Sequence, residues 1–420
     1  IVSLMTSIIP GLILFAPTIV FATPPDLNGW WFFLQLGALA AVFMYLMAQA
    51  YARAEAQQLA PIHYTELIYA SLLGSFLFHE VPRAQIRMGL EYLKRPGTTA
   101  EADRSVSEFI NQHYGAESLD YLAEPLLSGV YGGDPGRLSA ASVLTRFVEL
   151  EQKYGSLTRG VRAKAAKNGR ARGPEGGALF RTLKTGLSDL IERVASLAAE
   201  RLTVVHDSAE TVERDQDGYR VRVGGAWFSA KHVVLACPGY QAAAVLRGVD
   251  ADLAGVLNQV EYSSSLTLSL GYRRADLGAL PGFGFLVPKK ERRRMVACTV
   301  VQNKFSHRVA EDKAVLRCFF GGASDESVLN EPDEAIIQAA KDELRTLVGI
   351  TAEPVFHTIA RWPRSMAQYT VGHAQRLRQI EQMVSQLPGL HLAGNAYYGI
   401  GIPDCVRTGR DAAAKIAGKR

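Results

Sequence analysis

Hydrophobic positions are distributed unevenly, and the first eighty residues contain the longest apolar runs of the chain. Residues 2–22 and 30–52 are almost free of charge, and each is long enough to cross about 30 Å of hydrocarbon as a helix. The second run opens with aromatic residues, which are typical of a membrane interface. We therefore expect two transmembrane helices. A third apolar run, residues 59–78, carries His63 and Glu66, and polar groups at that depth are costly unless they face protein or water.

After Pro82 the pattern changes to the helix and strand periods of a globular protein. A helix is expected to begin near Ser105, because Ser105 and Glu108 have the spacing of a capping box. Further helices are predicted at residues 83–95, 179–202, 333–348 and 377–387. Short apolar or alternating runs bounded by turn residues predict strands at 202–205, 209–213, 219–223, 227–230, 231–239, 260–272, 282–288, 295–301, 315–322, 353–363 and 390–393. Such a mixture favours an α/β and α+β fold.

The stretch from Leu390 to Ala417 joins a short apolar strand, a glycine-rich turn and a helix with small residues on one face. Gly394, Gly399 and Gly401 can adopt positive φ angles and let the backbone approach a flat or phosphorylated ligand. The amide groups at the start of the helix favour an anion. For the glycines alone, an ordinary turn entering a C-terminal helix is an equally open interpretation.

Composition narrows the classes of partner. The chain has 420 residues and is 48% hydrophobic, which is enough for a large core and two or more domains. Its formal charge of +5 belongs to the C-terminal part, where it favours an anionic lipid surface or an acidic substrate. The sequence has no recognition-helix motif, so nucleic-acid binding is not expected. Four cysteines lie far apart without a CxxC motif, so we expect reduced thiols and no metal site.

Three phrases of the sequence resemble one family. Residues 392–409, LAGNAYYGIGIPDCVRTG, are similar to the C-terminal signature of the protoporphyrinogen and coproporphyrinogen oxidases, flavoproteins of haem synthesis related to the amine oxidases. Residues 124–139, EPLLSGVYGGDPGRLS, and the phrase from Trp362 to His373 resemble the same family. In that family the C-terminal block lies along the flavin, and its helix N-terminus faces the pyrophosphate of FAD.

The resemblance implies a set of site residues but no catalytic residue. The implied cofactor-binding positions are Ala209, Gly394, Asn395, Gly399, Ile400, Gly401, Ile402 and Asp404. The implied substrate-binding positions are Gly129, Leu286, Thr299 and Phe319. We expect Tyr369 and His373 to anchor a loop and to cap a helix, and a role near the flavin is the alternative.

Residues 1–82 resemble a different family, the drug/metabolite transporters of the EamA type, through the phrase APIHYTELIYASLLGSFLFHE at residues 60–80. A transporter needs both of its halves, so this segment is not expected to transport by itself. The two resemblances divide the chain into transmembrane helices at 1–82, the helical part of a substrate domain at 83–175, a partial FAD-binding domain at 176–260, the substrate-domain sheet and helices at 261–375, and a C-terminal FAD-binding segment at 376–420. The expected fold is flavin amine-oxidase-like, with an all-α membrane segment in front.

The implied reaction is the oxidation of protoporphyrinogen IX or coproporphyrinogen III, with hydride passing to FAD. Enzymes of this class begin with a strand, a GxGxxG turn and a helix, and the sequence contains no GxGxxG. We therefore expect poor FAD retention by this chain alone, and a second chain that supplies the missing dinucleotide-binding unit. The expected location is the cell inner membrane, with the oxidase part on the cytoplasmic side. The alternatives are a transporter-derived membrane protein with a non-catalytic C-terminal domain, and a chimeric gene product.

Overall fold

The computed structural model describes residues 31, 35, 42, 87, 89–95, 103–167, 182–278, 280–291 and 293–418. The chain divides into two compact units, Ile1–Pro82 and Arg83–Arg420. The apolar runs in which membrane helices are predicted lie outside the described residues, apart from three isolated positions. Within the described part, no helix combines the length and the apolar character needed to cross a bilayer.

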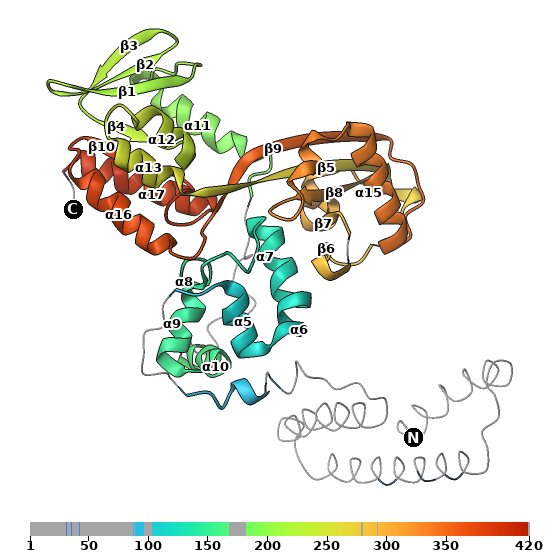
Figure 1. The fold of residues 1–420 in the computed structure, drawn as a ribbon. Coiled ribbons are helices and arrows are strands. Elements are labelled where there is room, and N and C mark those ends of the chain that lie inside the picture. The colour runs from blue at the N-terminus through green and yellow to red at the C-terminus, as the bar shows by residue number, and fades with distance from the viewer. Residues whose placement is uncertain are drawn as a thin grey trace. The chain divides into compact units, whose positions relative to one another are not determined.

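A cluster of short helices occupies residues 103–167 (Figure 1). These helices are α5 (Val106–Tyr114), α6 (Ala116–Ser118), the π-helical turn η1 (Leu119–Ala123), α7 (Glu124–Tyr131), α8 (Ala140–Val143), α9 (Thr145–Tyr154) and α10 (Leu157–Lys167). The predicted capping box is confirmed, because Ser105 Oγ accepts from the Glu108 amide at 3.1 Å and Ser105 N donates to Glu108 Oε2 at 2.8 Å. Phe109, Leu138 and Leu157 are buried at the centre of the cluster.

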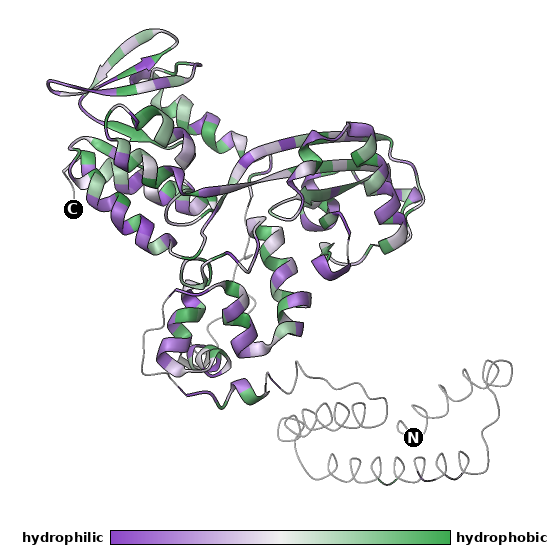
Figure 2. Cartoon of the chain, in the orientation of Figure 1, coloured by the Kyte–Doolittle hydropathy of each residue, from purple (hydrophilic) through white to green (hydrophobic). Residues whose placement is uncertain are grey.

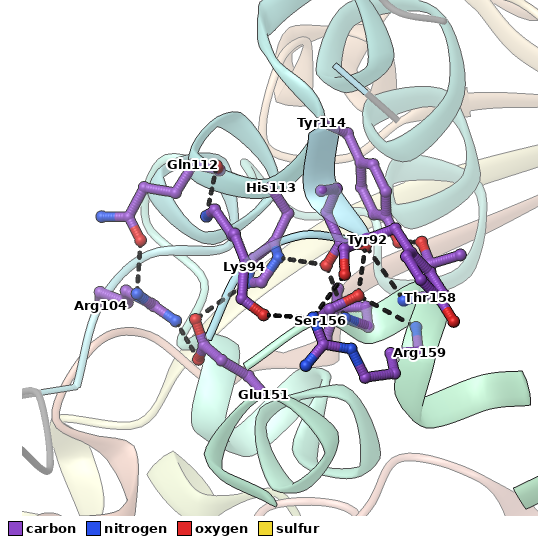
Figure 3. A network of polar contacts seen from close by, with 12 residues as sticks. Tyr92, Lys94, Arg104, Gln112, His113, Tyr114, Glu151, Ser156, Thr158 and Arg159 are labelled. Atoms are coloured by element: carbon purple, nitrogen blue, oxygen red, sulfur yellow. Dashed lines mark hydrogen bonds and ion pairs between the residues drawn. The ribbon is translucent and has the colours of Figure 1, made fainter. Parts of the chain in front are cut away.

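A buried polar network fastens residues 89–95 to this cluster (Figure 3). The Glu91 side chain is fully buried, and four donors point at its two oxygens: His113 Nδ1 at 2.9 Å, Ser156 Oγ at 2.9 Å, Leu157 N at 2.6 Å and Thr158 N at 3.1 Å. The other ring nitrogen of His113 lies 2.8 Å from Glu151 Oε1, and Glu151 also pairs with Arg104. Paired in this way, the buried carboxylate of Glu91 avoids the cost of an isolated buried charge.

Residues 182–258 and the C-terminal segment build a second region with two small sheets. β1 (Ala209–Asp215), β2 (Gly218–Val223) and β3 (Ala226–Ala230) form an antiparallel meander, and β4 (Val233–Leu235) pairs in parallel with β10 (Leu390–Leu392). The helices of this region are α11 (Ser188–Ala198), α12 (Gly239–Leu246), α13 (Ala251–Asn258), α16 (His373–Ser385) and α17 (Ile402–Ile416). Side chains of α12, α13 and α16 share one apolar core with β4 and β10.

The third region is an antiparallel sheet in the order β6-β7-β8-β5-β9. Its strands are β5 (Glu261–Arg273), β6 (Gly284–Leu286), β7 (Met295–Val300), β8 (Lys313–Gly321) and β9 (Phe356–Gln368). α15 (Asp333–Val348) packs on one face through Ile336, Ala340 and Leu344, and hydrophilic and hydrophobic segments alternate along these elements (Figure 2). Shorter pieces are α14 (Val301–Lys304) and the 3-10 turns η2 (Ala199–Arg201), η3 (Arg274–Asp276), η4 (Lys289–Glu291), η5 (Ser306–Arg308) and η6 (Glu326–Asn330).

Several predicted elements differ from the structure. The strand expected at 202–205 is absent, because this extended segment pairs with no other strand among the described residues. The helix expected from residue 179 begins at Ser188, and the one expected from residue 377 begins at His373. β9 continues to Gln368, past the proline at which the strand was expected to end, because pairing with β5 sustains it.

Candidate active site

The glycine-rich segment after β10 runs into the first turn of α17, and residues 394–404 are called here the flavin loop after the ligand that the sequence resemblance implies. It is positioned by the parallel pairing of β10 with β4 and by a hydrogen bond from Ala393 N to Leu235 O at 2.9 Å. Gly394 has φ 105°, and its amide donates to Thr408 Oγ1 at 3.0 Å. The β10 end of the loop is therefore tied both to the sheet and to α17.

The glycines of the flavin loop make room for Asp404 as well as for any ligand. Gly399 has φ 120°, and a Cβ at this position would collide with Asp404 Cγ. A Cβ on Gly401 would lie 3.2 Å from Asp404 Oδ2. Asp404 in turn pairs with Arg407 at 3.1 Å. The loop is folded around its own carboxylate, which the sequence-based interpretation of an open glycine cradle did not include.

Tyr369 and His373 anchor the flavin loop through hydrogen bonds to its backbone. The Tyr369 hydroxyl donates to Asn395 O at 2.8 Å and accepts from Gly399 N at 2.8 Å, and its ring stacks on His373 with centroids 4.1 Å apart. His373 Nε2 donates to Tyr397 O at 3.0 Å. Burial raises the pKa of Tyr369 and lowers the pKa of His373, so both stay neutral near pH 7. The two residues anchor the loop, as expected for Tyr369.

Three of the four predicted substrate residues share the face of the large sheet that α15 does not cover. Leu286 pairs with Ala297, which pairs with Phe319, and Thr299 lies two residues beyond Ala297 on the same strand. Since side chains alternate across a sheet, Leu286, Thr299 and Phe319 point to the same side. The alternate residues of β8, such as Cys318, are buried against α15. This side is called here the open face.

Helix α7 crosses the open face. The Glu124 carboxylate accepts from Lys289 N beside β6 at 3.2 Å, and Tyr131 O accepts from Gln368 Nε2 on β9 at 2.8 Å. Between them, a Cβ on Gly129 would lie 3.1 Å from Leu286 Cδ2, so the glycine lets the helix backbone approach the sheet closely. The structure thus brings Gly129 and Leu286 into contact.

The open face and the flavin loop meet near the end of β9. Trp362 lies on the open face, pairs with Ser265 and is 50% exposed. Three residues further on, Ser365 O lies 3.4 Å from Asn395 Nδ2 of the flavin loop. Arg364, between them, is the one non-glycine residue with positive φ (43°) among those described, and its guanidinium lies 3.7 Å over the Tyr240 ring. Sequence reasoning missed both Arg364 and Tyr240.

Ala209 lies in a different place from the other predicted cofactor residues. It begins β1, pairs with Val223 and is exposed. The chain runs from this meander into β4, and β4 pairs with β10, the strand that precedes the flavin loop. That pairing is what connects the meander to the loop. Its predicted contact with the adenosine part of FAD stays a prediction.

Comparison with known proteins defines the family of this arrangement. The sequence profile described as flavin containing amine oxidoreductase matches residues 48–417. The chain belongs to this family. The profile of the EamA-like transporter family matches residues 1–90. The resemblances stated from the sequence are therefore confirmed for both segments, and so is the flavin amine-oxidase-like fold.

Individual members of the family support the same conclusion. Coproporphyrinogen III oxidase of Bacillus subtilis (strain 168) is 31% identical over 323 residues, covering 76% of this chain and 68% of that protein. The enzyme of the same name from Staphylococcus aureus (strain NCTC 8325 / PS 47) is 28% identical over 344 residues, covering 80% of this chain and 73% of that protein. The crystal structure of a putative protoporphyrinogen oxidase from Exiguobacterium sp. 255-15 aligns with TM-score 0.67 and 30% identity, covering 80% of this chain and 72% of the other.

The flavin loop fits one side of the cofactor that gives the flavin-containing family its name. α17 has 15 residues, and no side chain caps the amides at its start. Pro403 has no amide hydrogen, and the Asp404 and Cys405 amides donate to Gly401 O. The amides of Gly401 and Ile402 are therefore the ones that can receive an anionic group. Gly399, Ile400 and Gly401 are half-buried, and Ile402 is 52% exposed, so the loop presents backbone and apolar surface to a ligand. The residues that would hold the flavin are Asn395, Gly399, Ile400, Gly401 and Ile402. The Asp404 carboxylate instead packs against Gly399 and pairs with Arg407.

Proposed function

We propose that this chain is a porphyrinogen oxidase-like flavoprotein that acts on coproporphyrinogen III or protoporphyrinogen IX. The observation that carries the proposal is the contact between Asn395 of the flavin loop and Ser365 at the end of the open face. We interpret the flavin loop as the cofactor surface and the open face as the substrate surface, and this contact joins the two in a chain whose relatives bear the names of porphyrinogen oxidases. A porphyrinogen is a large, flexible, apolar ring with carboxylate-bearing edges, and such a ligand needs an extended apolar contact.

The residues of this chain contribute position. When bound, FAD supplies the chemistry by accepting hydride from the macrocycle. Leu286, Phe319 and Trp362 offer apolar and aromatic surface that displaces water from the substrate ring. Tyr369 fixes both ends of the loop segment 395–399, so the distance between cofactor and substrate surfaces is set before substrate binds.

We further propose that a second chain completes the cofactor site with a dinucleotide-binding unit. Among the residues that the structure describes, the parallel sheet of β4 and β10 has two strands, and Val234 at its centre is 41% exposed although both neighbours in β4 are buried. Parallel sheets are normally covered on both faces. A strand-turn-helix unit with GxGxxG would extend this sheet and bind the pyrophosphate.

An apolar surface next to this sheet region is also uncovered. Leu187, Leu190, Ile191, Val194 and Leu197 are between 39% and 73% exposed along α11, which has no buried residue. Leu202, Val204 and Val205 follow and are between 44% and 56% exposed. Uninterrupted apolar surface of this kind marks an interface in soluble proteins. The unpaired extended segment 202–205 offers free backbone groups that an added strand can satisfy.

We propose that the N-terminal segment anchors the protein in the cell inner membrane, with the oxidase part on the cytoplasmic side. The support is the match of residues 1–90 to the EamA-like transporter family together with the two apolar runs in the sequence. Extraction from membranes only by detergent is the expected behaviour. Release of the full chain by salt alone would contradict it.

The experiment that tests the proposed function uses the full chain in detergent. It is purified alone and after co-expression with the part of the Bacillus subtilis relative that has no counterpart in this chain. Each preparation receives FAD and either coproporphyrinogen III or protoporphyrinogen IX in air, and the fluorescence of the aromatic porphyrin is followed. We expect porphyrin to form with the two chains together and slowly or not at all with either alone. Porphyrin formation no faster than without protein in every combination would favour the transporter-derived alternative, in which the C-terminal part is not catalytic.

A further inference from the structure

The open face carries one cation at its centre. Arg317 lies on β8, the middle strand of the five-stranded sheet, and is exposed. Its pairing partners are Thr299 on β7 and Ser269 on β5. Phe319, two residues along the same strand, points to the same side. A charged residue in the middle of a sheet, beside predicted substrate positions, calls for a physical reason.

The surroundings of Arg317 offer hydroxyl groups but no counter-charge. Arg317 Nε lies 3.4 Å from Ser269 Oγ, a long and weak hydrogen bond. Among the residues that the structure describes, no carboxylate forms an ion pair with Arg317. Its two terminal guanidinium nitrogens therefore keep their donors available to a ligand.

Two other arginines of the same region are held by ion pairs. Arg294 pairs with Asp325 and Glu331, at 3.2 and 2.6 Å. Arg361, on β9, pairs with Asp333 at 2.7 Å and donates to the backbone carbonyls of Leu329 and Glu331. These arginines bind parts of the fold together, whereas Arg317 contributes nothing comparable. Its role is not explained by the stability of the sheet.

Aromatic and apolar side chains surround this cation on the open face. Phe356 covers Gly271, where a Cβ would collide with the Phe356 ring, and Phe356 is 47% exposed. Trp362 lies six residues further along β9, at the middle of the strand, and is 50% exposed, and Leu286 on β6 is 42% exposed. The register places Arg317 between these groups, with Thr358 and Ser269 in its own row. An apolar ring laid on this surface would have a guanidinium within reach of an acidic substituent.

We propose that Arg317 binds a carboxylate of the substrate and so positions the porphyrinogen on the open face. The inference rests on the proposed function, and it assigns a ligand chemistry to a residue that the sequence resemblance leaves out. Guanidinium and carboxylate match as two parallel charge-assisted hydrogen bonds, and arginine is the residue best suited to this geometry. Arg317 is thus a binding and positioning residue, and it takes no part in hydride transfer.

A binding experiment tests this role without requiring turnover. The probes are coproporphyrin III, which carries four carboxylates, and its tetramethyl ester, which carries none. Their binding to the full chain in detergent is followed by porphyrin fluorescence for the wild type, Arg317→Gln, Arg317→Lys and the control Arg378→Gln. Arg378 is exposed on α16, away from the open face, so its substitution removes one positive charge without touching the proposed site.

The expected pattern separates a carboxylate contact from a general effect. Arg317→Gln should weaken coproporphyrin III binding by about tenfold to a hundredfold, the range for a lost charge-assisted contact, and should leave the ester unchanged within about twofold. Arg317→Lys should recover part of the loss, and Arg378→Gln should bind both probes like the wild type. Because Arg317 is exposed, its variants should keep the circular dichroism of the wild type.

Three results would overturn the inference. If Arg317→Gln binds coproporphyrin III like the wild type, the residue does not contact a carboxylate. If Arg317→Gln weakens binding of the tetramethyl ester to the same extent as binding of coproporphyrin III, the substitution acts on folding or on the apolar surface. If the wild type binds neither probe, the proposed function fails and this inference fails with it, which distinguishes that outcome from the first two.

Discussion

Replacing Glu91 by glutamine perturbs the most deeply buried charge described in the second unit. The Glu91 carboxylate receives two donors on each oxygen, from His113, Leu157, Ser156 and Thr158. An amide has one accepting oxygen and one NH₂ group, and the His113 ring or the Ser156 hydroxyl can accept from that NH₂, so in either orientation one backbone amide, Leu157 N or Thr158 N, faces another donor. One unsatisfied buried donor costs about 1–3 kcal/mol. Breaking a buried charged pair by removing one partner costs about 3–5 kcal/mol.

We therefore expect Glu91→Gln to destabilise the helical cluster by about 3–5 kcal/mol, a large part of the roughly 5–15 kcal/mol that stabilises a domain. Hydrogen exchange of the full chain in detergent measures this locally, in peptides covering α5 and α9. Protection there should fall on the order of a hundredfold to a thousandfold. Glu149→Gln is the matched control, because Glu149 is exposed on α9 and should leave protection unchanged. Equal protection in the two variants would refute the reasoning.

Three further expectations follow from the same contacts. Burial opposes ionisation of Glu91 and Glu151, yet their hydrogen bonds lower both pKa values below the ordinary 4.5. The stability that the two carboxylates contribute is therefore complete above pH 4.5 and is lost as the pH falls through their lower pKa values in the folded protein. Hydrogen exchange of α5 that does not change between about pH 5 and about pH 2, after correction for the intrinsic exchange rate, would disprove this. Tyr369→Phe removes both hydrogen bonds from the Tyr369 hydroxyl to the flavin loop. At about 0.5–1.5 kcal/mol per bond, it should weaken FAD binding to the two-chain complex by about tenfold, as measured by flavin fluorescence. Unchanged affinity would show that the loop needs no anchor. Gly399→Ala should destabilise the loop by about 1–3 kcal/mol, because the residue has a positive φ and its Cβ would collide with Asp404. In a double-mutant cycle measured by thermal unfolding, adding Asp404→Ala should recover part of this loss. Strictly additive effects would mean that the two residues do not touch.

Local signals in the sequence predicted local structure well. The capping box at Ser105, the alternation along β5 and the helix 333–348 each depend on residues close in sequence, and all are present. The strand expected at 202–205 was wrong because a strand needs a neighbour, and none pairs with it among the described residues. Strand propensity alone does not supply that partner.

The candidate site was predictable only where resemblance pointed to it. The common orientation of Leu286, Thr299 and Phe319 follows from the register across three strands, which no local pattern encodes. The position of Arg317 between them depends on the same register. Sequence reasoning considered only a ligand beside Gly399, whereas in the structure the Asp404 side chain also packs against this glycine. The Glu91 network joins residues up to 67 positions apart, and no local pattern in the sequence predicted it.

The central claim is that residues 394–404 hold a flavin beside the open face, and fluorescence from Trp362 tests it most directly. The sequence has four tryptophans, so a variant with Trp30, Trp31 and Trp227 changed to phenylalanine reports on Trp362 alone, three residues from the contact with Asn395. FAD is titrated into this variant together with the complementing chain. We predict saturable quenching of Trp362 that coincides with flavin binding. Flavin binding that leaves Trp362 fluorescence unchanged would place the cofactor elsewhere and contradict the account.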